Sequence, residues 1–303
     1  MTATAPAPAP SGVRIWVMAA RIRTLPASIA PVLVGTALAG YEHVFHPLRL
    51  LAALLGAIFI QVGTNLSNDY SDARRGADAE DRLGPVRVTA GGLVPPRQVL
   101  LATYISFGAA VVAGAYLIAV AGWLLLAIGA ASILAGVLYT GGPRPYGYEG
   151  LGELFVFLFF GIVAVVGSYF VQTTHLQWEA FALAVPVGLL ASAILMVNNV
   201  RDIDSDRRAG KRTLAVRLGR ARMRALFAAA VYFSYLLAPV TWLFGPLSAW
   251  LFLPWLTVPA AAAIVREVRN RVDGPSLNRA LAHTGLLQLS FCVLLSAGLL
   301  LSR

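Results

Sequence analysis

Long apolar segments recur along almost the whole chain and are separated by short polar connections. A segment of about 20 apolar residues is the length of helix that crosses the hydrocarbon core of a bilayer. No alternating apolar and polar pattern, typical of strands, stands out between them. The pattern predicts an all-α membrane bundle with nine transmembrane helices, at about 24–41, 48–68, 98–120, 121–140, 151–172, 180–200, 225–244, 247–265 and 280–301.

The composition agrees with a membrane protein. Of 303 residues, 58% are hydrophobic and 13% are charged, whereas soluble domains carry about a quarter charged residues. Residues 1–12 are rich in Ala, Pro, Thr and Ser and are expected to form a disordered tail. The rest of the chain, 13–303, is expected to form a single transmembrane domain. Its one cysteine, Cys292, excludes an intrachain disulfide.

The charged residues are distributed very unevenly between the two sides of the predicted bundle. All Lys and Arg except Arg49 and Arg303 fall on the N-terminal side, and so do all Asp and Glu except Glu42 and Glu179. The positive-inside rule makes that side cytoplasmic in a multi-pass protein of the cell membrane. The net charge of +10 is therefore interpreted as a topology signal, and no nucleic-acid partner is expected.

Two similar polar motifs end the second and sixth predicted helices. The first contains Asn65, Asp69 and Asp72, and the second contains Asn198, Asp202 and Asp206. In each motif an Asn precedes an Asp by four residues, so in a helix the polar side chains share one face. Asn65 and Asn198 are 133 residues apart, and so are Asp69 and Asp202. This offset, between helices that run in the same direction, predicts a parallel repeat of four helices with the ninth added.

The carboxylates of these motifs need a compensating cation. They lie near helix C-termini, where the macrodipole disfavours negative charge, and near hydrocarbon, where a lone carboxylate is costly. Neighbouring arginines and snorkelling into the interface offer one solution. The other is Mg²⁺, which binds carboxylate and amide oxygens together with water and substrate phosphates. Because the motif occurs twice, with matching Asn residues and on the same side, metal binding is favoured.

Basic residues next to the acidic motifs suggest what the metal binds. Arg201 adjoins Asp202, and Lys211 and Arg212 follow Asp206. Carboxylates that hold a metal, beside cations that hold phosphate, suit a metal–diphosphate complex. In the connection 139–148, Arg144 could bind phosphate and Tyr139 could meet the reacting centre, but an aromatic interfacial anchor explains this connection equally well. The charged connection 72–97 is expected to be a substrate loop rather than a merely solvated one.

These motifs resemble the UbiA superfamily of intramembrane prenyltransferases, over roughly 14–300. The segments that carry the resemblance are 21–26 with 31–37, 65–72 with 81–87, 138–143, 150–153, and 198–206 with 210–214. Segments 81–87 and 138–143 resemble most the branch that acts on 1,4-dihydroxy-2-naphthoate in menaquinone synthesis. The first motif of the family often has a third Asp where this chain has Gly76, and Asp78 is expected to supply the missing oxygen.

The resemblance implies a chemistry and a role for each residue. Mg²⁺ held by Asp69, Asp72, Asp202 and Asp206, with Asn65, Asn198 and Asp78, would bind the diphosphate of a long polyprenyl donor, whose tail lies between helices and membrane lipid. Ionisation would give an allylic cation near Tyr139, and the ring of 1,4-dihydroxy-2-naphthoate would attack it and lose its carboxylate as CO₂. Arg144, Lys211, Arg212 and Arg201 would bind diphosphate. Arg21 and Arg23 would bind the anionic ring, or would anchor the topology.

Two other functions remain open from the sequence. The first is prenyl transfer to 4-hydroxybenzoate or another aromatic ring by the same chemistry. The second is a cation-coupled transporter with two acidic sites in a parallel repeat. A transporter predicts charged residues and broken helices near the middle of the membrane, whereas the predicted helices here carry their acids at one end.

Overall fold

The computed structural model describes residues 12–77, 83–84 and 86–303, so residues 1–11 of the predicted tail and Asp78 lie outside the described part. All regular structure in that part is helical, which confirms the all-α prediction. The elements are α1 (Gly12–Ala20), η1 (Ile22–Thr24), α2 (Leu25–Tyr41), α3 (Pro47–Arg74), α4 (Pro96–Ala121), α5 (Leu124–Leu138), α6 (Gly152–Val156), η2 (Phe157–Val163), α7 (Ala164–Thr173), α8 (Trp178–Arg208), α9 (Leu214–Leu218), α10 (Arg220–Leu237), α11 (Val240–Phe244), η3 (Ala249–Thr257), α12 (Val258–Asn270) and α13 (Gly274–Leu301).

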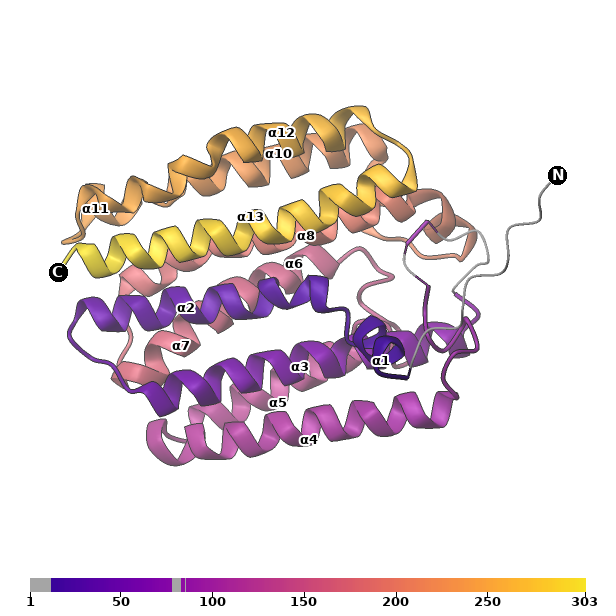
Figure 1. The fold of residues 1–303 in the computed structure, drawn as a ribbon, viewed down its shortest axis with the longest axis horizontal. Coiled ribbons are helices and arrows are strands. Elements are labelled where there is room, and N and C mark those ends of the chain that lie inside the picture. The colour runs from indigo at the N-terminus through magenta and orange to yellow at the C-terminus, as the bar shows by residue number, and fades with distance from the viewer. Residues whose placement is uncertain (1–11, 78–82, 85) are drawn as a thin grey trace.

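The number of membrane-crossing segments agrees with the sequence. Among the described residues, eight helical stretches are long and apolar enough to cross a membrane, and α5 is a shorter apolar helix between two of them. Most of the long helices run along the bundle, whereas α1 crosses one end of it (Figure 1). Gly12, assigned to the tail by composition, is the first residue of α1.

Three of the nine predicted helices are interrupted, and local sequence explains two of the interruptions. The seventh breaks between α10 and α11 at Pro239, and the eighth begins as the 3₁₀ segment η3, which contains Pro254. Proline lacks the backbone donor that a regular helix needs. The fifth contains the π-helical segment η2 between α6 and α7. Such segments are frequent at functional sites, and η2 lines the cavity described below.

The two helices that carry the acidic motifs are longer than predicted. α3 ends at Arg74 rather than near residue 68, and α8 ends at Arg208 rather than near residue 200. The motifs therefore occupy the last turns of continuous helices. Both helices end at the same end of the bundle, because Lys211, just after α8, lies 3.5 Å from the Asp72 carboxylate of α3.

The main core lies where α8 and α13 meet α2, α7 and α10. Its largest fully buried side chains include Leu190, Phe227, Phe291 and Tyr169. A smaller cluster holds α1 and the connection before α4 against α3, through Ala19, Leu66 and Val88 among others. These contacts fix the rotation of α3 and α8 about their axes, which decides the side chains that face inward.

Close packing of η2 against α8 gives a first prediction. A Cβ added to Gly161 would lie 2.7 Å from Gly188 Cα and 2.9 Å from the Ala184 carbonyl oxygen. Since backbone cannot move aside easily, Gly161→Ala is expected to lower the free energy of unfolding by about 1–3 kcal/mol. Thermal unfolding in detergent measures this. Gly167→Ala is the matched control, because its Cβ meets no atom within 4 Å; equal losses in both variants would contradict the packing argument.

Candidate active site

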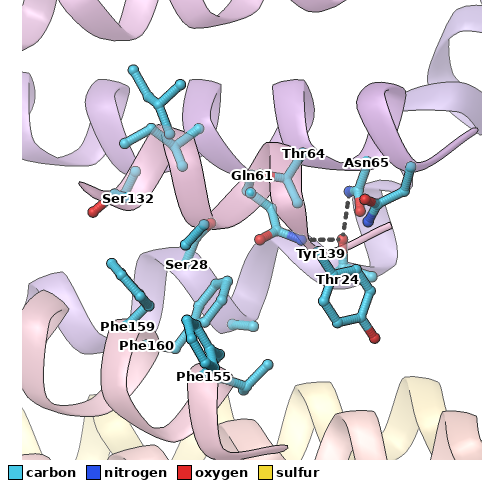
Figure 2. Close-up of a pocket in the computed structure, with 18 of the residues that line it drawn as sticks. Thr24, Ser28, Gln61, Thr64, Asn65, Ser132, Tyr139, Phe155, Phe159 and Phe160 are labelled. Atoms are coloured by element: carbon cyan, nitrogen blue, oxygen red, sulfur yellow. Dashed lines mark hydrogen bonds between the residues drawn. The ribbon is translucent and has the colours of Figure 1, made fainter. Parts of the chain in front are cut away.

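A cavity of about 790 Å³ opens between α2, α3, α4, α5, η2 and α8. Its two halves differ in chemistry. Carboxylates, amides and a lysine gather where α3 and α8 end, whereas the other half is lined by aliphatic and aromatic side chains such as Leu117, Leu125, Ile128 and Phe160. Figure 2 shows part of the cavity wall, where Gln61 and Asn65 both donate to Thr24 Oγ1, at 3.1 and 3.0 Å.

On α3, the cavity is lined by Asn65, Asn68 and Asp72, which share one helix face. Asp69 is not part of this lining. Its two oxygens accept the backbone N–H groups of Val88 and Thr89, at 3.1 and 3.0 Å. In this structure Asp69 therefore anchors the connection between α3 and α4. Its contacts are structural, and its role as a metal ligand stays a prediction.

Asp72 is a buried carboxylate of the site with several polar partners. It is 1% exposed, and it accepts hydrogen bonds from the Tyr148 hydroxyl at 2.6 Å and from Arg87 at 3.2 Å. Lys211 Nζ lies 3.5 Å from the same carboxylate and 4.7 Å from the centre of the Tyr148 ring. Two cations and a phenol thus compensate the charge that the macrodipole at the end of α3 disfavours.

On α8, the cavity is lined by Asn198, Asn199, Asp202 and Asp206. Arg201 is not in the lining and is 3% exposed. Its guanidinium donates to both oxygens of Asp202 at 2.8 and 2.5 Å. The remaining donors reach Asn198 Oδ1 at 2.8 Å and Asn278 Oδ1 of α13 at 2.6 Å. Arg201 therefore orients Asp202 from behind and offers no donor to the cavity.

The acidic motifs of α3 and α8 align differently in the structure from the alignment that the sequence suggested. Asn68 and Asp72 on α3 match Asp202 and Asp206 on α8 at an offset of 134, and each pair is spaced i, i+4. The predicted offset of 133 matched Asp69 with Asp202 instead. Asn68 was missed, although its spacing to Asp72 was a usable signal. Its Oδ1 accepts a hydrogen bond from Thr140 at 3.0 Å.

The structure separates the predicted basic residues other than Arg201 into two groups. Lys211 and Arg21 line the cavity. The side chains of Arg23, Arg144 and Arg212 are exposed and lie outside its lining, so their predicted roles remain predictions. Arg87 and Tyr148 also line the site, and no spacing in the sequence pointed to them.

Tyr139, the first residue after α5, borders the cavity with other aromatic residues. Its ring packs edge-on against Tyr146, with centroids 5.5 Å apart, and Tyr146 stacks on Phe155 at 4.0 Å. A phenol is protonated at neutral pH. An electron-rich protonated ring can face a cation without neutralising it chemically.

The oxygen donors at the polar end fit a hard divalent cation. The Asp72, Asp202 and Asp206 carboxylates and the Asn68 amide are ligands of the type that Mg²⁺ accepts. In the part of the chain that the structure describes, no three His, Cys, Asp or Glu side chains converge into a closed metal site. These residues therefore suit a metal whose coordination is completed by water and phosphate oxygens rather than by protein alone.

A scan against family profiles matches residues 28–299 to the UbiA prenyltransferase family. The chain belongs to this family. Like its membrane-bound relatives, this UbiA-family protein is a bundle of apolar helices, and the resemblance seen in its motifs is confirmed.

The UbiA relatives include proteins of known activity. A 1,4-dihydroxy-2-naphthoate octaprenyltransferase from Mycobacterium tuberculosis is 42% identical over 94% of this chain and 96% of its own length. An Escherichia coli protein of the same name is 38% identical over 90% of this chain and 91% of its own length. This UbiA-family chain therefore matches such relatives over nearly their whole length.

Solved structures support the fold of this UbiA-family protein. A UbiA homolog from Aeropyrum pernix superposes with a TM-score of 0.70 at 16% identity, covering 93% of this chain and 98% of that one. A homolog from Archaeoglobus fulgidus, solved with DMAPP and Mg²⁺, gives 0.65 at 14% identity, covering 93% and 99%. At these identities the similarity establishes the fold alone.

Proposed function

We propose that this chain transfers a polyprenyl group from its diphosphate to 1,4-dihydroxy-2-naphthoate. The observation that carries the proposal is the shape of the cavity, which joins three carboxylates and Lys211 to a long apolar half. A polyprenyl diphosphate has the same two parts, an anionic head and an apolar tail. The relatives named above, which match this chain over nearly its whole length, supply the identity of the acceptor ring.

The transfer makes one carbon–carbon bond and breaks two bonds. The prenyl C1 bonds to the ring carbon that carries the carboxylate, the diphosphate leaves with its electron pair, and the carboxylate departs as CO₂. The prenylated product is the reduced form of demethylmenaquinone. Mg²⁺ bound at the carboxylates would neutralise the leaving diphosphate.

The position of each residue in the cavity suggests its role in the reaction. Asp72, Asp202 and Asp206 offer the metal ligands at the polar end, and Lys211 can leave Asp72 for a phosphate oxygen. Tyr139, between the polar end and the apolar half, faces the prenyl group as it gains positive charge. The apolar half excludes water, which would otherwise capture that cation.

The polar end is assigned to the cytoplasmic side of the cell membrane. This assignment rests on the positive-inside rule, since Arg21, Arg87, Arg201 and Lys211 lie at the end where α3 and α8 terminate. The opposite end carries Arg49 and Arg303, which bind backbone carbonyls of Val171 and Gly40 there. Both substrates are anionic, so a basic rim at the mouth favours their approach.

An in vitro reaction tests the proposal. Purified protein is given Mg²⁺, an all-trans polyprenyl diphosphate and either 1,4-dihydroxy-2-naphthoate or 4-hydroxybenzoate, and the products are identified by mass spectrometry. The expected product carries one prenyl chain and lacks the carboxylate, and EDTA is expected to stop its formation. Turnover of 4-hydroxybenzoate without turnover of the naphthoate would assign the chain to the other aromatic acceptor.

A further inference from the structure

A buried pair of side chains lies beside the cavity and has no role in the function proposed above. Glu153 is near the start of α6, and Asn199 is one turn before Asp202 on α8. They are 6% and 5% exposed, and Asn199 Nδ2 donates to Glu153 Oε1 at 2.8 Å. Ser192 Oγ donates to the Glu153 backbone carbonyl at 3.0 Å, which holds α6 on α8.

This hydrogen bond fixes the direction of the Asn199 amide. The oxygen of Glu153 accepts, so Asn199 must turn its NH₂ group to Glu153 and its Oδ1 away from it. Asn199 lines the cavity, and within the described part of the chain no group donates to Oδ1. That oxygen is not among the side-chain atoms sealed from solvent. The pair therefore presents one oriented carbonyl oxygen to the cavity.

Asn199 borders the apolar half of the cavity. It precedes Asp202 by three positions, which is about 4.5 Å along the helix axis toward the apolar half. Leu195, Tyr139 and Phe155 line the cavity with it. Leu195 and the Tyr139 ring both pack close to Gly152, the neighbour of Glu153. A flat ring that enters beside the prenyl C1 would meet these side chains.

Only one reactant can satisfy the Asn199 oxygen. Ionised diphosphate oxygens accept hydrogen bonds and do not donate, and an isoprenoid tail carries no N–H or O–H group. The hydroxyl groups of the acceptor ring do donate. We propose that Asn199 Oδ1 accepts a hydrogen bond from a ring hydroxyl of the acceptor, and that Glu153 is the positioning residue that holds the amide. The inference rests on the proposed prenyl transfer and adds to it the residue that recognises the hydroxyl.

Competitive inhibition tests the inference without relying on ring reactivity. Inhibition constants are measured for 1-hydroxy-2-naphthoate, 4-hydroxy-2-naphthoate and 2-naphthoate, which share the ring and the carboxylate. In the unchanged protein one of the hydroxylated rings is expected to bind at least about tenfold more tightly than 2-naphthoate. In Asn199→Ala this preference is expected to fall close to one, while the KM of the prenyl donor and the half-saturating Mg²⁺ concentration stay the same.

Variants of Glu153 separate positioning from folding. Glu153→Gln keeps an oxygen that accepts from Asn199 and is expected to retain most of the hydroxyl preference, whereas Glu153→Ala is expected to lose it. Ser192→Ala, which removes the bond to the Glu153 backbone only, is the control and should keep the preference. An unchanged preference in Asn199→Ala would overturn the inference, and so would a raised Mg²⁺ requirement, which would make Asn199 a metal ligand. Absence of prenyl transfer in the unchanged protein would overturn the proposed function instead.

Discussion

Asp72→Ala is expected to lower kcat/KM for prenyl transfer by at least about 10²–10³-fold, the loss typical when charge stabilisation of a transition state is removed. Asp72 is almost completely buried at the polar end of the cavity, and it is the carboxylate that Lys211, Arg87 and Tyr148 all contact. Without it, α3 would offer no carboxylate to a metal in the cavity, but only neutral side chains such as Asn68 and Asn65. The half-saturating Mg²⁺ concentration, measured in a prenyl-transfer assay, is therefore expected to rise as well.

Asp204→Ala is the matched control for this experiment. Asp204 belongs to the second acidic motif but is exposed, lies outside the cavity and pairs with Arg220 at 2.8 Å. Its loss is expected to change activity less than about twofold, because exposed ion pairs contribute little. Near-normal activity of Asp72→Ala at ordinary Mg²⁺ would exclude Asp72 from the metal site. Equal losses in both variants would indicate a general effect of charge rather than a specific ligand.

Arg201→Ala is expected to destabilise the fold strongly. The variant leaves the Asp202 carboxylate buried without the guanidinium that contacts both of its oxygens, and it frees Asn198 and Asn278. Breaking a buried pair by removing one partner costs about 3–5 kcal/mol, which corresponds to a fall of roughly 10 °C in the apparent unfolding temperature. Thermal unfolding of the protein in detergent measures this loss.

Arg201→Lys distinguishes the geometry from the charge. Lysine keeps the charge but lacks the planar fork that reaches Asp202, Asn198 and Asn278 together, so an intermediate loss of stability is expected. The sequence assigned Arg201 to diphosphate binding, and that role predicts a different result for Arg201→Ala. An unchanged unfolding temperature in Arg201→Ala, combined with a large rise in the KM of the prenyl donor, would restore the assignment to diphosphate.

The fold was predictable because its main signal is local. A run of about 20 apolar residues has one stable arrangement in a bilayer, a helix, so the positions of the helices followed from the chain alone. The interruptions at Pro239, η2 and η3 were missed, since hydrophobicity measures a segment's apolar character and not its hydrogen-bond pattern. The ends of α3 and α8 were also missed. Their charged last turns lack the apolar signal, although they remain helical.

The candidate site was only partly predictable, and Asp69 and Asn68 show why. Helical periodicity states which side chains are neighbours on a helix, but it does not state toward which partner that face is turned. Packing of α3 against α1, α4 and the connection before α4 decides the rotation. That rotation turns Asn68 and Asp72 into the cavity and gives Asp69 to the amides of Val88 and Thr89. The sequence aligned the two motifs with an offset one residue too small, so it placed Asp69 in the cavity and overlooked Asn68.

The sequence by itself determined the class of this protein: an all-α membrane bundle of the UbiA family, with two acidic motifs at one end. Apolar length, charge asymmetry and motif spacing are properties of the chain, so no contact needed to be known. The tertiary structure alone decided which motif residues face the substrate cavity and which support them. Glu153 of α6 orients Asn199 of α8 across a contact between helices, and Asn278 of α13 accepts a hydrogen bond from Arg201, which lies behind Asp202. Such contacts depend on how helices pack, and no local pattern in the sequence records them.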